Sequence, residues 1–592
     1  TARAVVEAGA DFGVAFDGDF DRCFLFDAAG EFVEGEYVVA LLAQAALAQN
    51  PGQPIVHDPR VTRAIRAAIT SAGGKPVASR TGHAYIKEAL RTAGAPYGGE
   101  MSGHHYFRDF FYCDSGMLPW MMVAQHLTQS GQTLAEAVAE MTVTRPAEGW
   151  SEQDPASWIT AAEQALDAFK VSHPTELAAV RGIGFSGQMH GATLLDSSDA
   201  VLPPCMLWND TRSHKEAMVL DATPRVRDLS GNIVFPGFTA PKLSWVAIHE
   251  PEIFARVAKV MLPKDYVLWW LTGQFTTEMS DAAGTAWLNV EKRIWSDFLL
   301  EAGNMSIDQM PDLLEGTDIV GPLQPDRSDL GFPAGVLVIA GGADNAVAAC
   351  GVGALGEGDG FVSLGTSGVV LAGRDSYAPS AESAIHTFCH AVPGRWYQMG
   401  VVLAATDSLN WLSQLTGKSP SELSGSLDDS LGPVCPSKFY PYLSGERTPH
   451  NDAQVRAGFT GLDIATGSQE LAQSVMEGVS FAMRDSLEAL RSTGAKLETA
   501  LAIGGGSQSD RWTRILATTL NIPLERPEAG TFGAALGAAR IAICGVLGVK
   551  PENVMIKPKI KDTIEPDQNF TAEYDNAYRG FAAAYKTLKV MP

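Results

Sequence analysis

The stretch FVSLGTSGVVL at residues 361–371 decides how this chain is expected to fold. Two apolar runs flank the turn Gly365-Thr366-Ser367-Gly368, which predicts a β-hairpin. Glycines that bracket two hydroxyl groups give a turn whose N–H groups can approach a phosphate, because no side chain stands in the way. Such turns also occur in ordinary sheets, so a hairpin without a ligand is the alternative.

Other apolar runs that end in glycine predict further strands. Residues 180–185, 336–340 and 500–503 are such runs, and strands that alternate with helices indicate an α/β fold with parallel sheets. Ligands bind at the carboxyl ends of such strands. Gly504-Gly505-Gly506-Ser507 follows the third run and precedes a helix expected near Asp510, so its backbone is expected to lie against an adenosine. The lack of a Walker lysine argues against a P-loop NTPase.

Side chains suited to a sugar follow the first of these strands. Met189 and His190, within GQMHG at residues 187–191, offer a flat apolar contact and an imidazole to a polyol. The alternative for His190 is a structural histidine with its hydrogen bonds satisfied. Asp281 precedes two alanines and a glycine, so little blocks its carboxylate from a bound hydroxyl. A carboxylate there would orient the accepting hydroxyl and take its proton late in phosphoryl transfer.

A different chemistry is predicted near the start of the chain. Two short strands at residues 12–16 and 23–26 flank DGDFDR, in which Asp17, Asp19 and Asp21 alternate. Three carboxylates on one side of a loop suit Mg²⁺, while a solvated acidic turn is the alternative. A third interpretation, the opening phosphate hairpin of a kinase, is disfavoured because the turn lacks Gly-Thr and lies too far from the later motifs.

Further along this segment, His83 and Lys87 stand four residues apart, on one face of a predicted helix. Glu100 and Ser102 offer a carboxylate and a hydroxyl in a loop made flexible by glycine.

Composition restricts the classes of function. A length of 592 residues predicts several domains, and a net charge of −24 disfavours nucleic acid and anionic membranes as partners. We find no membrane segment and no leader sequence, and seven scattered cysteines without a C-x-x-C pair indicate free buried thiols. A cytoplasmic location is therefore expected.

From about residue 141 onward, the motifs together resemble the FGGY family of carbohydrate kinases. GFTAPKLSW at residues 237–245 and YLSGERTPH at 442–450 carry the resemblance as well. It implies an α/β, actin-like (ribonuclease H-like) fold with two lobes. The implied roles are ketose contacts at Met189 and His190, a catalytic base at Asp281, ATP phosphate contacts at Gly365 and Thr366, and a nucleotide pocket at Gly505 and Gly506.

The residues that make up these motifs favour D-xylulose over glycerol or gluconate as substrate. The implied reaction is ATP plus D-xylulose giving ADP and D-xylulose 5-phosphate, with Mg²⁺ bridging the phosphates; a homodimer is compatible with the sequence. The family opens with a hairpin bearing Asp-x-Gly-Thr, and a different segment stands in its place here. We therefore expect impaired folding and a reduced rate, because positioning and charge neutralisation supply most of the catalysis in phosphoryl transfer.

The first segment resembles the phosphomannomutase/phosphoglucomutase family. The resemblance implies a metal loop at Asp17, Asp19 and Asp21, sugar recognition at Glu100 and Ser102, and acid/base chemistry at His83 and Lys87. That family also needs a phosphoserine domain and a domain that clamps the substrate phosphate. Neither matches this chain, so mutase turnover is not expected.

The join between the two segments is predicted within residues 134–155, where a helical pattern runs into a stretch punctuated by glycine and proline. The predicted domains are the end of a mutase metal-binding domain (1–26), a mutase sugar-recognition domain (27–140), and the two kinase lobes (141–300 and 301–592). Rival hypotheses are a mutase completed by domains in trans and a non-catalytic sugar-binding chimera or misassembled reading frame. A natural bifunctional fusion is less favoured, because the join cuts through both partners.

Overall fold

The computed structural model describes residues 1–17, 21–58, 63–80, 82–130, 133–134, 147, 149–427, 430–528 and 533–589. The chain divides into two compact units, Thr1–Arg145 (unit 1) and Pro146–Pro592 (unit 2), and we describe each by itself. Much of the predicted join at residues 134–155 lies outside the described residues. Within the described part of the chain, no helix is both long enough and apolar enough to cross a membrane.

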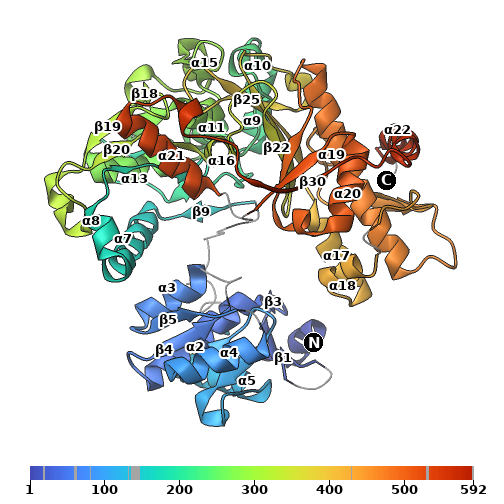
Figure 1. The fold of residues 1–592 in the computed structure, drawn as a ribbon. Helices are drawn as coiled ribbons and strands as arrows, with labels where there is room; N and C mark the ends of the chain where they lie inside the picture. Colours follow the sequence, from blue (N-terminus) through green and yellow to red (C-terminus); the bar gives the residue numbers. More distant parts are fainter. Residues whose placement is uncertain are drawn as a thin grey trace. The chain divides into compact units, whose positions relative to one another are not determined.

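Unit 1 contains two sheets and the helices that pack on them (Figure 1). One sheet is antiparallel, in the order β1-β2-β3; the other has the order β5-β4-β6-β7-β8 and is parallel among β4, β5 and β6. The strands are β1 (Phe12–Ala15), β2 (Phe24–Asp27), β3 (Phe32–Val33), β4 (Pro54–His57), β5 (Lys75–Ala78), β6 (Tyr97–Gly99), β7 (His105–Phe107) and β8 (Cys113–Asp114). The helices are α1 (Ala2–Ala8), α2 (Gly35–Gln49), α3 (Arg63–Ser71), α4 (His83–Ala93) and α5 (Met117–Ser130).

Helix α2 forms the centre of the unit 1 core. Most of its side chains from Val38 to Leu47 are buried, and they share one apolar cluster with Leu25 of β2 and Ile55 of β4. A helix that is apolar on nearly all sides must be surrounded by protein. This explains the long apolar run at residues 37–48 as a core helix.

The first part of unit 2 is built from short strands and many helices. The strands are β9 (Glu152–Gln153), β10 (Gly182–Ile183), β11 (Ser186–Gly187), β12 (Thr193–Leu195), β13 (Cys205–Met206), β14 (Lys259–Met261), β15 (Thr276–Glu278), β16 (Leu288–Asn289), β17 (Ile294–Trp295), β18 (Asp312–Leu314), β19 (Ile319–Pro322), β20 (Leu337–Ile339) and β21 (Gly342–Ala343). The helices are α7 (Pro155–Ser172), α8 (Pro174–Ala178), α9 (His214–Ala222), α10 (Val226–Ser230), α11 (Thr239–His249), α12 (Pro251–Phe254), α13 (Pro263–Thr272), α14 (Met279–Ala282), α15 (Asp297–Ala302) and α16 (Asp344–Val352).

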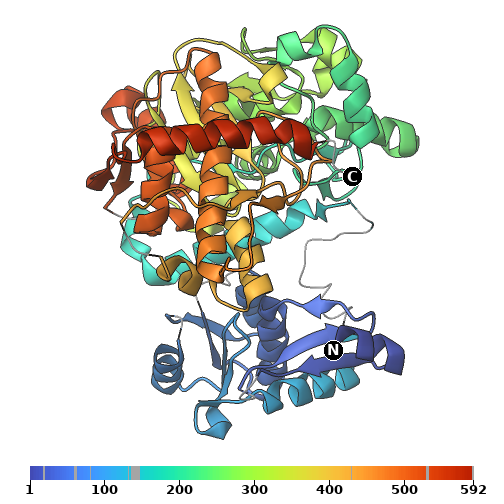
Figure 2. The same ribbon diagram turned by 90° about the vertical axis from the view of Figure 1, so that its right-hand side faces the viewer.

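The second part of unit 2 is organised by one sheet in the order β24-β25-β23-β22-β28-β29-β30. Its strands are β22 (Gly360–Leu364), β23 (Gly368–Arg374), β24 (His386–Cys389), β25 (Trp396–Val402), β28 (Ala500–Ile503), β29 (Leu524–Pro527) and β30 (Ile560–Ile564), and the small sheet beside it holds β26 (Lys438–Tyr440) and β27 (Gly458–Thr460). The helices are α17 (Thr406–Thr416), α18 (Pro420–Gly425), α19 (Ser468–Ser492), α20 (Asp510–Leu520), α21 (Ala534–Leu547) and α22 (Thr571–Leu588). Helix α22 crosses α19 and α20, which Figure 2 shows as a red helix over orange ones.

Most of the predicted strands of unit 2 are found. The hairpin at residues 361–371 is β22 and β23, and the run at 500–503 is β28, which pairs in parallel with β22. The prediction of a buried strand at 180–185 is wrong in part, since β10 covers only Gly182–Ile183 and is half-buried. The physical reason is its place at the edge of the sheet β10-β20-β19, where it pairs on one side only among the described strands.

The thiols largely follow their prediction. All seven cysteines are free, and six are buried. Cys113 differs, because β8 lies at the edge of its sheet and its thiol is exposed.

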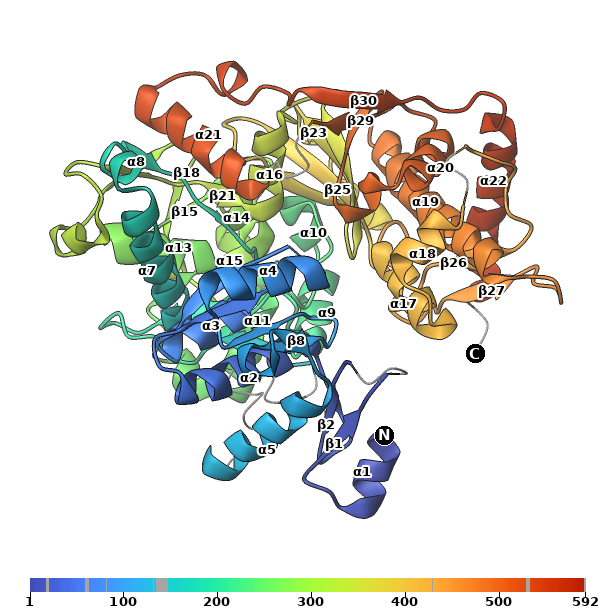
Figure 3. The same ribbon diagram turned by 60° about the horizontal axis from the view of Figure 1, so that its bottom comes forward.

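Helices α16 and α21 pack so closely that glycine is required between them (Figure 3). A methyl group built on Gly537 would lie 1.9 Å from the carbonyl oxygen of Val347, well inside contact distance. We expect Gly537→Ala to lower the free energy of unfolding of unit 2 by about 1–3 kcal/mol, because the added methyl group forces the backbone, and not a flexible side chain, to move. Thermal or urea unfolding measures this.

The matched control is Gly580→Ala on the exposed face of α22, where a methyl group would meet nothing within 4 Å. That change is expected to stabilise by up to about 1 kcal/mol, because alanine is the better helix former. Equal effects of the two substitutions would contradict the packing argument.

The buried ring of His390 predicts a pH dependence of stability. Its Nδ1 accepts a hydrogen bond from Val392 N at 3.2 Å, and its Nε2 lies 3.1 Å from the Ala354 carbonyl oxygen. Only the neutral ring satisfies both contacts. Burial accordingly lowers the pKa of His390 from its ordinary value of 6.5 to about 4.

The pKa of His390 is lower in the folded than in the unfolded protein. The stability that the neutral ring contributes is therefore fully present above about pH 6.5 and is lost as the pH falls towards about 4. We expect unit 2 to unfold more easily in that window, with a dependence approaching about 1.4 kcal/mol per pH unit from this group. In His390→Gln, the number of protons taken up on unfolding in this pH range should be smaller by about one. Urea midpoints at several pH values test this, and an unchanged slope would show that His390 does not titrate on unfolding.

Candidate active site

One pair of parallel strands brings the predicted sugar residues together with a carboxylate that sequence reasoning missed. Strand β11 pairs with β21 in parallel, with Gly187 opposite Ala343. The segment Gln188 to His190 and the residue Asp344 therefore leave the same edge of the sheet. Asp344 begins α16, and its side chain is exposed. This edge, where parallel strands end, is the usual place for ligands in α/β proteins.

Asp281 lies directly behind this edge. The hydroxyl of Ser280 accepts a hydrogen bond from Ala343 N at 3.0 Å, which ties α14 to the end of β21. The side chain of Glu278 caps α14 by accepting from the backbone N–H groups of Ser280 and Asp281. Asp281 itself is completely buried, and neither carboxylate oxygen has a hydrogen-bond partner among the described residues.

The ammonium of Lys264 supplies the positive charge in this cluster. Its Nζ lies 2.5 Å from Asp265 Oδ1 and 3.7 Å from Asp281 Oδ2. Burial raises the pKa of Asp281 well above its usual range despite Lys264, and Asp265 and Glu278 raise it further. The protein around Asp344 also raises the pKa of that carboxyl, although the side chain reaches solvent. Acidic groups therefore outnumber the single lysine here.

Met189 and His190 meet the Asp281 segment at Gly284. The ring Nδ1 of His190 lies 2.7 Å from the Gly284 carbonyl oxygen, and a methyl group on Gly284 would lie 2.6 Å from Met189 Cε. The imidazole stacks on Phe238 with the ring centroids 4.6 Å apart. Burial lowers the pKa of His190 to about 3, so the ring is neutral at physiological pH.

The backbone of His190 is strained, with a φ of 70° that non-glycine residues rarely adopt. Its carbonyl oxygen accepts hydrogen bonds from Lys242 Nζ at 2.8 Å and Thr239 Oγ1 at 3.2 Å. These bonds and the stacked ring hold the strained residue in place. Strain of this kind is concentrated at functional sites.

A loop from the second part of unit 2 reaches the same residues. The guanidinium of Arg447 lies over the ring of Phe235 at 4.2 Å, and its charge helps to lower the pKa of His190. The loop is tied to the last helix, α22, where the Tyr585 hydroxyl donates to Asp452 Oδ2 at 2.8 Å and the Tyr585 ring stacks on His450 at 3.6 Å.

The two predicted nucleotide loops also lie together. Because β22 and β28 are parallel, the turn at Gly365 and Thr366 and the glycines that follow β28 leave one edge of the sheet. A methyl group on Gly504 would lie 3.1 Å from Gly365 N, and one on Gly506 would lie 2.9 Å from Leu364 Cβ. Near Gly505 nothing lies within 4 Å of such a methyl group, so that glycine faces open space.

The start of α17 orients the turn. Ala405 N donates to the Thr366 carbonyl oxygen at 2.8 Å, and Thr406 N donates to that of Gly365 at 3.0 Å. The carbonyl groups are thereby engaged on the protein side, while the Thr366 side chain is exposed. Such a turn is suited to receive a phosphate on its outer face.

In unit 1 the predicted mutase residues meet at one place. His83 and Lys87 on α4 both contact Asp114 on β8, at 3.1 Å and 2.8 Å. Glu100 accepts hydrogen bonds from Gly82 N at 2.7 Å and from the Tyr106 hydroxyl at 2.7 Å. The Ser102 hydroxyl lies 3.0 Å from His104 Nδ1.

The described part of the predicted metal loop has its charge met by an arginine. Arg22 Nε lies 3.1 Å from Asp17 Oδ2 and 3.9 Å from Asp21 Oδ1, and Asp21 Oδ2 lies 3.4 Å from His104 Nε2. Asp19 lies outside the described residues. Asp21 Oδ1 has no hydrogen-bond partner among the described residues, and the magnesium site at Asp17, Asp19 and Asp21 stays a prediction.

Three residues that sequence reasoning did not single out belong to these sites. Asp344 carried a signal, since it follows two glycines at the end of a predicted strand. His104 ends the loop at residues 99–104, of which only Glu100 and Ser102 were singled out. No sequence pattern indicated Asp114. Its contact with His83 depends on two strand pairings, β6 with β7 and β7 with β8.

Comparison with known protein families finds a match for each of the two parts of the chain. The N-terminal domain of the FGGY family of carbohydrate kinases matches residues 122–351, and the C-terminal domain of that family matches residues 360–545. The alpha/beta/alpha domain III of phosphoglucomutase/phosphomannomutase matches residues 34–144. The first and third matches overlap across the end of unit 1.

Individual relatives agree with these matches. The xylulose kinase of Escherichia coli (strain K12) is 44% identical over 471 residues, which cover 78% of this chain and 96% of that protein. A xyloylose kinase from Brucella ovis, a solved structure, is 50% identical with a TM-score of 0.75, and the match covers 76% of this chain and 93% of that one.

A phosphomannomutase of Salmonella montevideo is 60% identical over 149 residues, 25% of this chain. The chain spans only 33% of that relative. The expected architecture, a two-lobed actin-like α/β kinase preceded by a phosphohexomutase domain fragment, is confirmed. The chain belongs to the FGGY family of carbohydrate kinases, with a segment similar to domain III of phosphoglucomutase/phosphomannomutase before the kinase part.

Proposed function

We propose that unit 2 phosphorylates D-xylulose with ATP, giving D-xylulose 5-phosphate and ADP. The observation that carries this proposal is the 44% identity that extends over 96% of a xylulose kinase. The geometry supports it, because Met189, His190 and the Asp281 segment meet at Gly284, and the glycine loops predicted to receive ATP lie together.

The proposed roles follow from exposure and position. Met189 and His190 contact the ketose, and the neutral imidazole of His190 offers a hydrogen bond without charge. Gly365 and Thr366 receive the ATP phosphates, while Gly505 and Gly506 line the nucleotide site.

For the base, two carboxylates compete. Asp281 is the residue predicted from the sequence, but it is completely buried beside Lys264. Asp344 leaves the same strand edge as His190 and reaches solvent. A base must come within hydrogen-bond distance of the sugar hydroxyl, so we propose that Asp344 takes the proton and that Asp281 holds Lys264 and α14 in position.

We further propose that Mg²⁺ enters with ATP. The cluster fits such an ion, since Asp265, Glu278, Asp281 and Asp344 exceed the charge of Lys264, and both oxygens of Asp281 lack a hydrogen-bond partner among the described residues. When bound, the ion would neutralise negative charge that develops during phosphoryl transfer.

The mutase alternative receives less support. The chain matches only 33% of the phosphomannomutase relative, and the two described carboxylates of the metal loop share Arg22. We expect no conversion of mannose 1-phosphate. The reduced kinase rate expected for a missing opening hairpin also stays a prediction, as do a homodimer and a cytoplasmic location; six buried free thiols are in line with the latter.

The first prediction separates the two candidate bases. In Asp344→Asn we expect kcat for D-xylulose to fall by about 10²–10⁴-fold with little change in KM, because the general base is lost. In Asp281→Asn we expect a smaller fall in kcat together with a lower melting temperature, because the buried contact between this carboxyl and Lys264 is changed. ADP release with MgATP measures turnover.

Glycerol and mannose 1-phosphate serve as substrate controls in the same assay. If folded Asp281→Asn were inactive while Asp344→Asn kept its turnover, Asp281 would be the base. Absence of turnover from folded wild-type chain would overturn the kinase proposal itself.

The second prediction concerns the nucleotide loop. We expect Gly505→Ala to leave the melting temperature unchanged, because the added methyl group meets no protein atom within 4 Å, and to raise KM for ATP about 10-fold or more. KM for D-xylulose should not change. The control Gly580→Ala should leave both constants alone, and an unaltered KM for ATP in Gly505→Ala would place the nucleotide elsewhere.

A further inference from the structure

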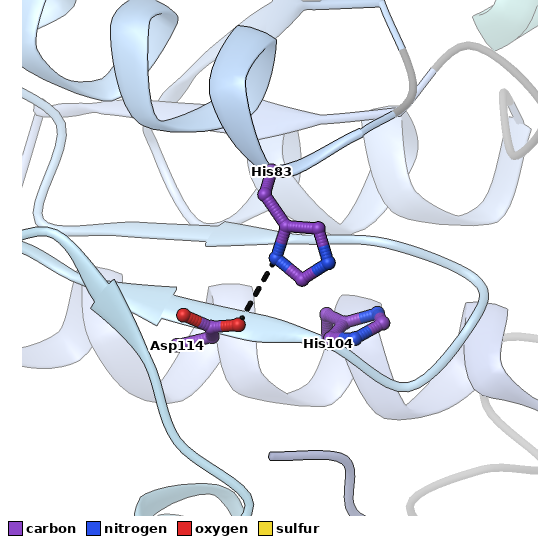
Figure 4. Close-up of side chains that lie close together, drawn as sticks. All are labelled: His83, His104 and Asp114. Atoms are coloured by element: carbon purple, nitrogen blue, oxygen red, sulfur yellow. Dashed lines mark hydrogen bonds and ion pairs between the residues drawn. The ribbon is translucent and has the colours of Figure 1, made fainter.

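We propose that His83, His104 and Asp114 of unit 1 form a binding site for a divalent transition-metal ion of the Zn²⁺ class. One ligand atom from each of the three side chains lies within 4.8 Å of the others (Figure 4). Its three residues belong to unit 1, whereas the proposed kinase residues belong to unit 2; His104 also contacts the predicted Mg²⁺ loop, with Asp21 Oδ2 3.4 Å from His104 Nε2.

The spacing of the donor atoms is close to what a tetrahedral ion needs. With metal–ligand bonds of about 2.0–2.2 Å, two ligand atoms of a tetrahedral site lie about 3.3–3.6 Å apart. His83 Nδ1 and Asp114 Oδ2 are already 3.1 Å apart, and the rings of His83 and His104 have centroids 4.5 Å apart. Closing the site therefore requires a shift of about 1.5 Å or less at the longest separation, and the ion must displace Arg22 Nε, which lies 3.3 Å from His104 Nε2.

The exposure of the three residues favours entry and retention of an ion. The His83 side chain is 50% exposed, whereas those of His104 and Asp114 are 6% and 14% exposed. Solvent can reach the cluster at His83, so a fourth position is available to water, as in open metal sites.

Partners of the ligands hold them in place. Lys87 Nζ lies 2.8 Å from Asp114 Oδ1, which leaves Oδ2 towards His83. Ser102 Oγ lies 3.0 Å from His104 Nδ1, and Glu100 Oε2 lies 3.7 Å from the same nitrogen. Hydrogen-bonded carboxylates and hydroxyls beside the ligands orient imidazole rings in metal sites.

The donor types select the ion. Two imidazole nitrogens and one carboxylate suit Zn²⁺, Co²⁺, Ni²⁺ or Cu²⁺, whereas Mg²⁺ prefers oxygen ligands only. Three carboxylates, at Asp21, Glu100 and Asp114, surround the cluster, against two cations at Arg22 and Lys87. A dication would thus meet a surplus of negative charge.

Bound metal would join three separate segments of unit 1. His83 begins α4, His104 precedes β7, and Asp114 ends β8. An ion that binds only the folded unit stabilises it in proportion to the logarithm of its concentration over Kd.

The test is titration of the untagged, metal-free full chain with Co²⁺, followed by visible absorption, with Zn²⁺ as competitor. We expect one bound Co²⁺ with bands typical of nitrogen and oxygen ligands, displacement by Zn²⁺ but not by excess Mg²⁺, and a raised melting temperature for unit 1. His83→Ala and Asp114→Asn should each weaken binding by about 10–100-fold.

The matched control is His214→Ala, which removes an exposed histidine of unit 2 and should leave binding unchanged. His83 is half exposed, so its alanine variant should fold, and an unchanged melting temperature of the metal-free protein checks this. Binding that is absent in the wild type, survives in both ligand variants, or yields to Mg²⁺ would overturn the proposal.

Discussion

The buried ammonium of Lys264 is the constraint on which the proposed sugar site of unit 2 depends. It lies among the carboxylates of Asp265, Glu278 and Asp281, which belong to α13 and to the β15–α14 segment. Its own side chain packs at the end of β11, where a methyl group on Gly187 would lie 2.6 Å from Lys264 Cβ. An uncompensated buried charge is strongly unfavourable, so the lysine and its carboxylates must stay together. Their assembly fixes the edge from which His190 and Asp344 emerge.

Much of this arrangement could be predicted from local sequence patterns. The spacing of His83 and Lys87 indicated one helical face, and both side chains indeed contact Asp114. The run at 500–503 predicted β28 correctly because a central strand is apolar on both faces. The strand at 180–185 was predicted too long, since burial of an edge strand depends on neighbours that its own sequence does not reveal.

The residues that were missed depend on pairing between distant segments. Asp344 leaves the same sheet edge as His190 because β11 and β21 pair in parallel. The residues of these two strands stand more than a hundred positions apart in the sequence. Asp281 looked accessible because small residues follow it, but those residues allow α14 to pack tightly and bury its carboxylate. Small neighbours predict close packing as readily as access, and only the tertiary structure distinguishes the two.

The docking of α22 has a consequence for the order in which the site is completed during synthesis. The loop that carries Arg447 is held by Tyr585 through Asp452 and His450. On the ribosome, that loop emerges more than a hundred residues before its anchor, while His190 and its neighbours emerge earlier still. Domains fold largely as the chain leaves the ribosome, from the N-terminus onward. The proposed sugar site of unit 2 is therefore assembled in two stages, and the loop that carries Arg447 is fixed only after nearly the whole chain has been translated.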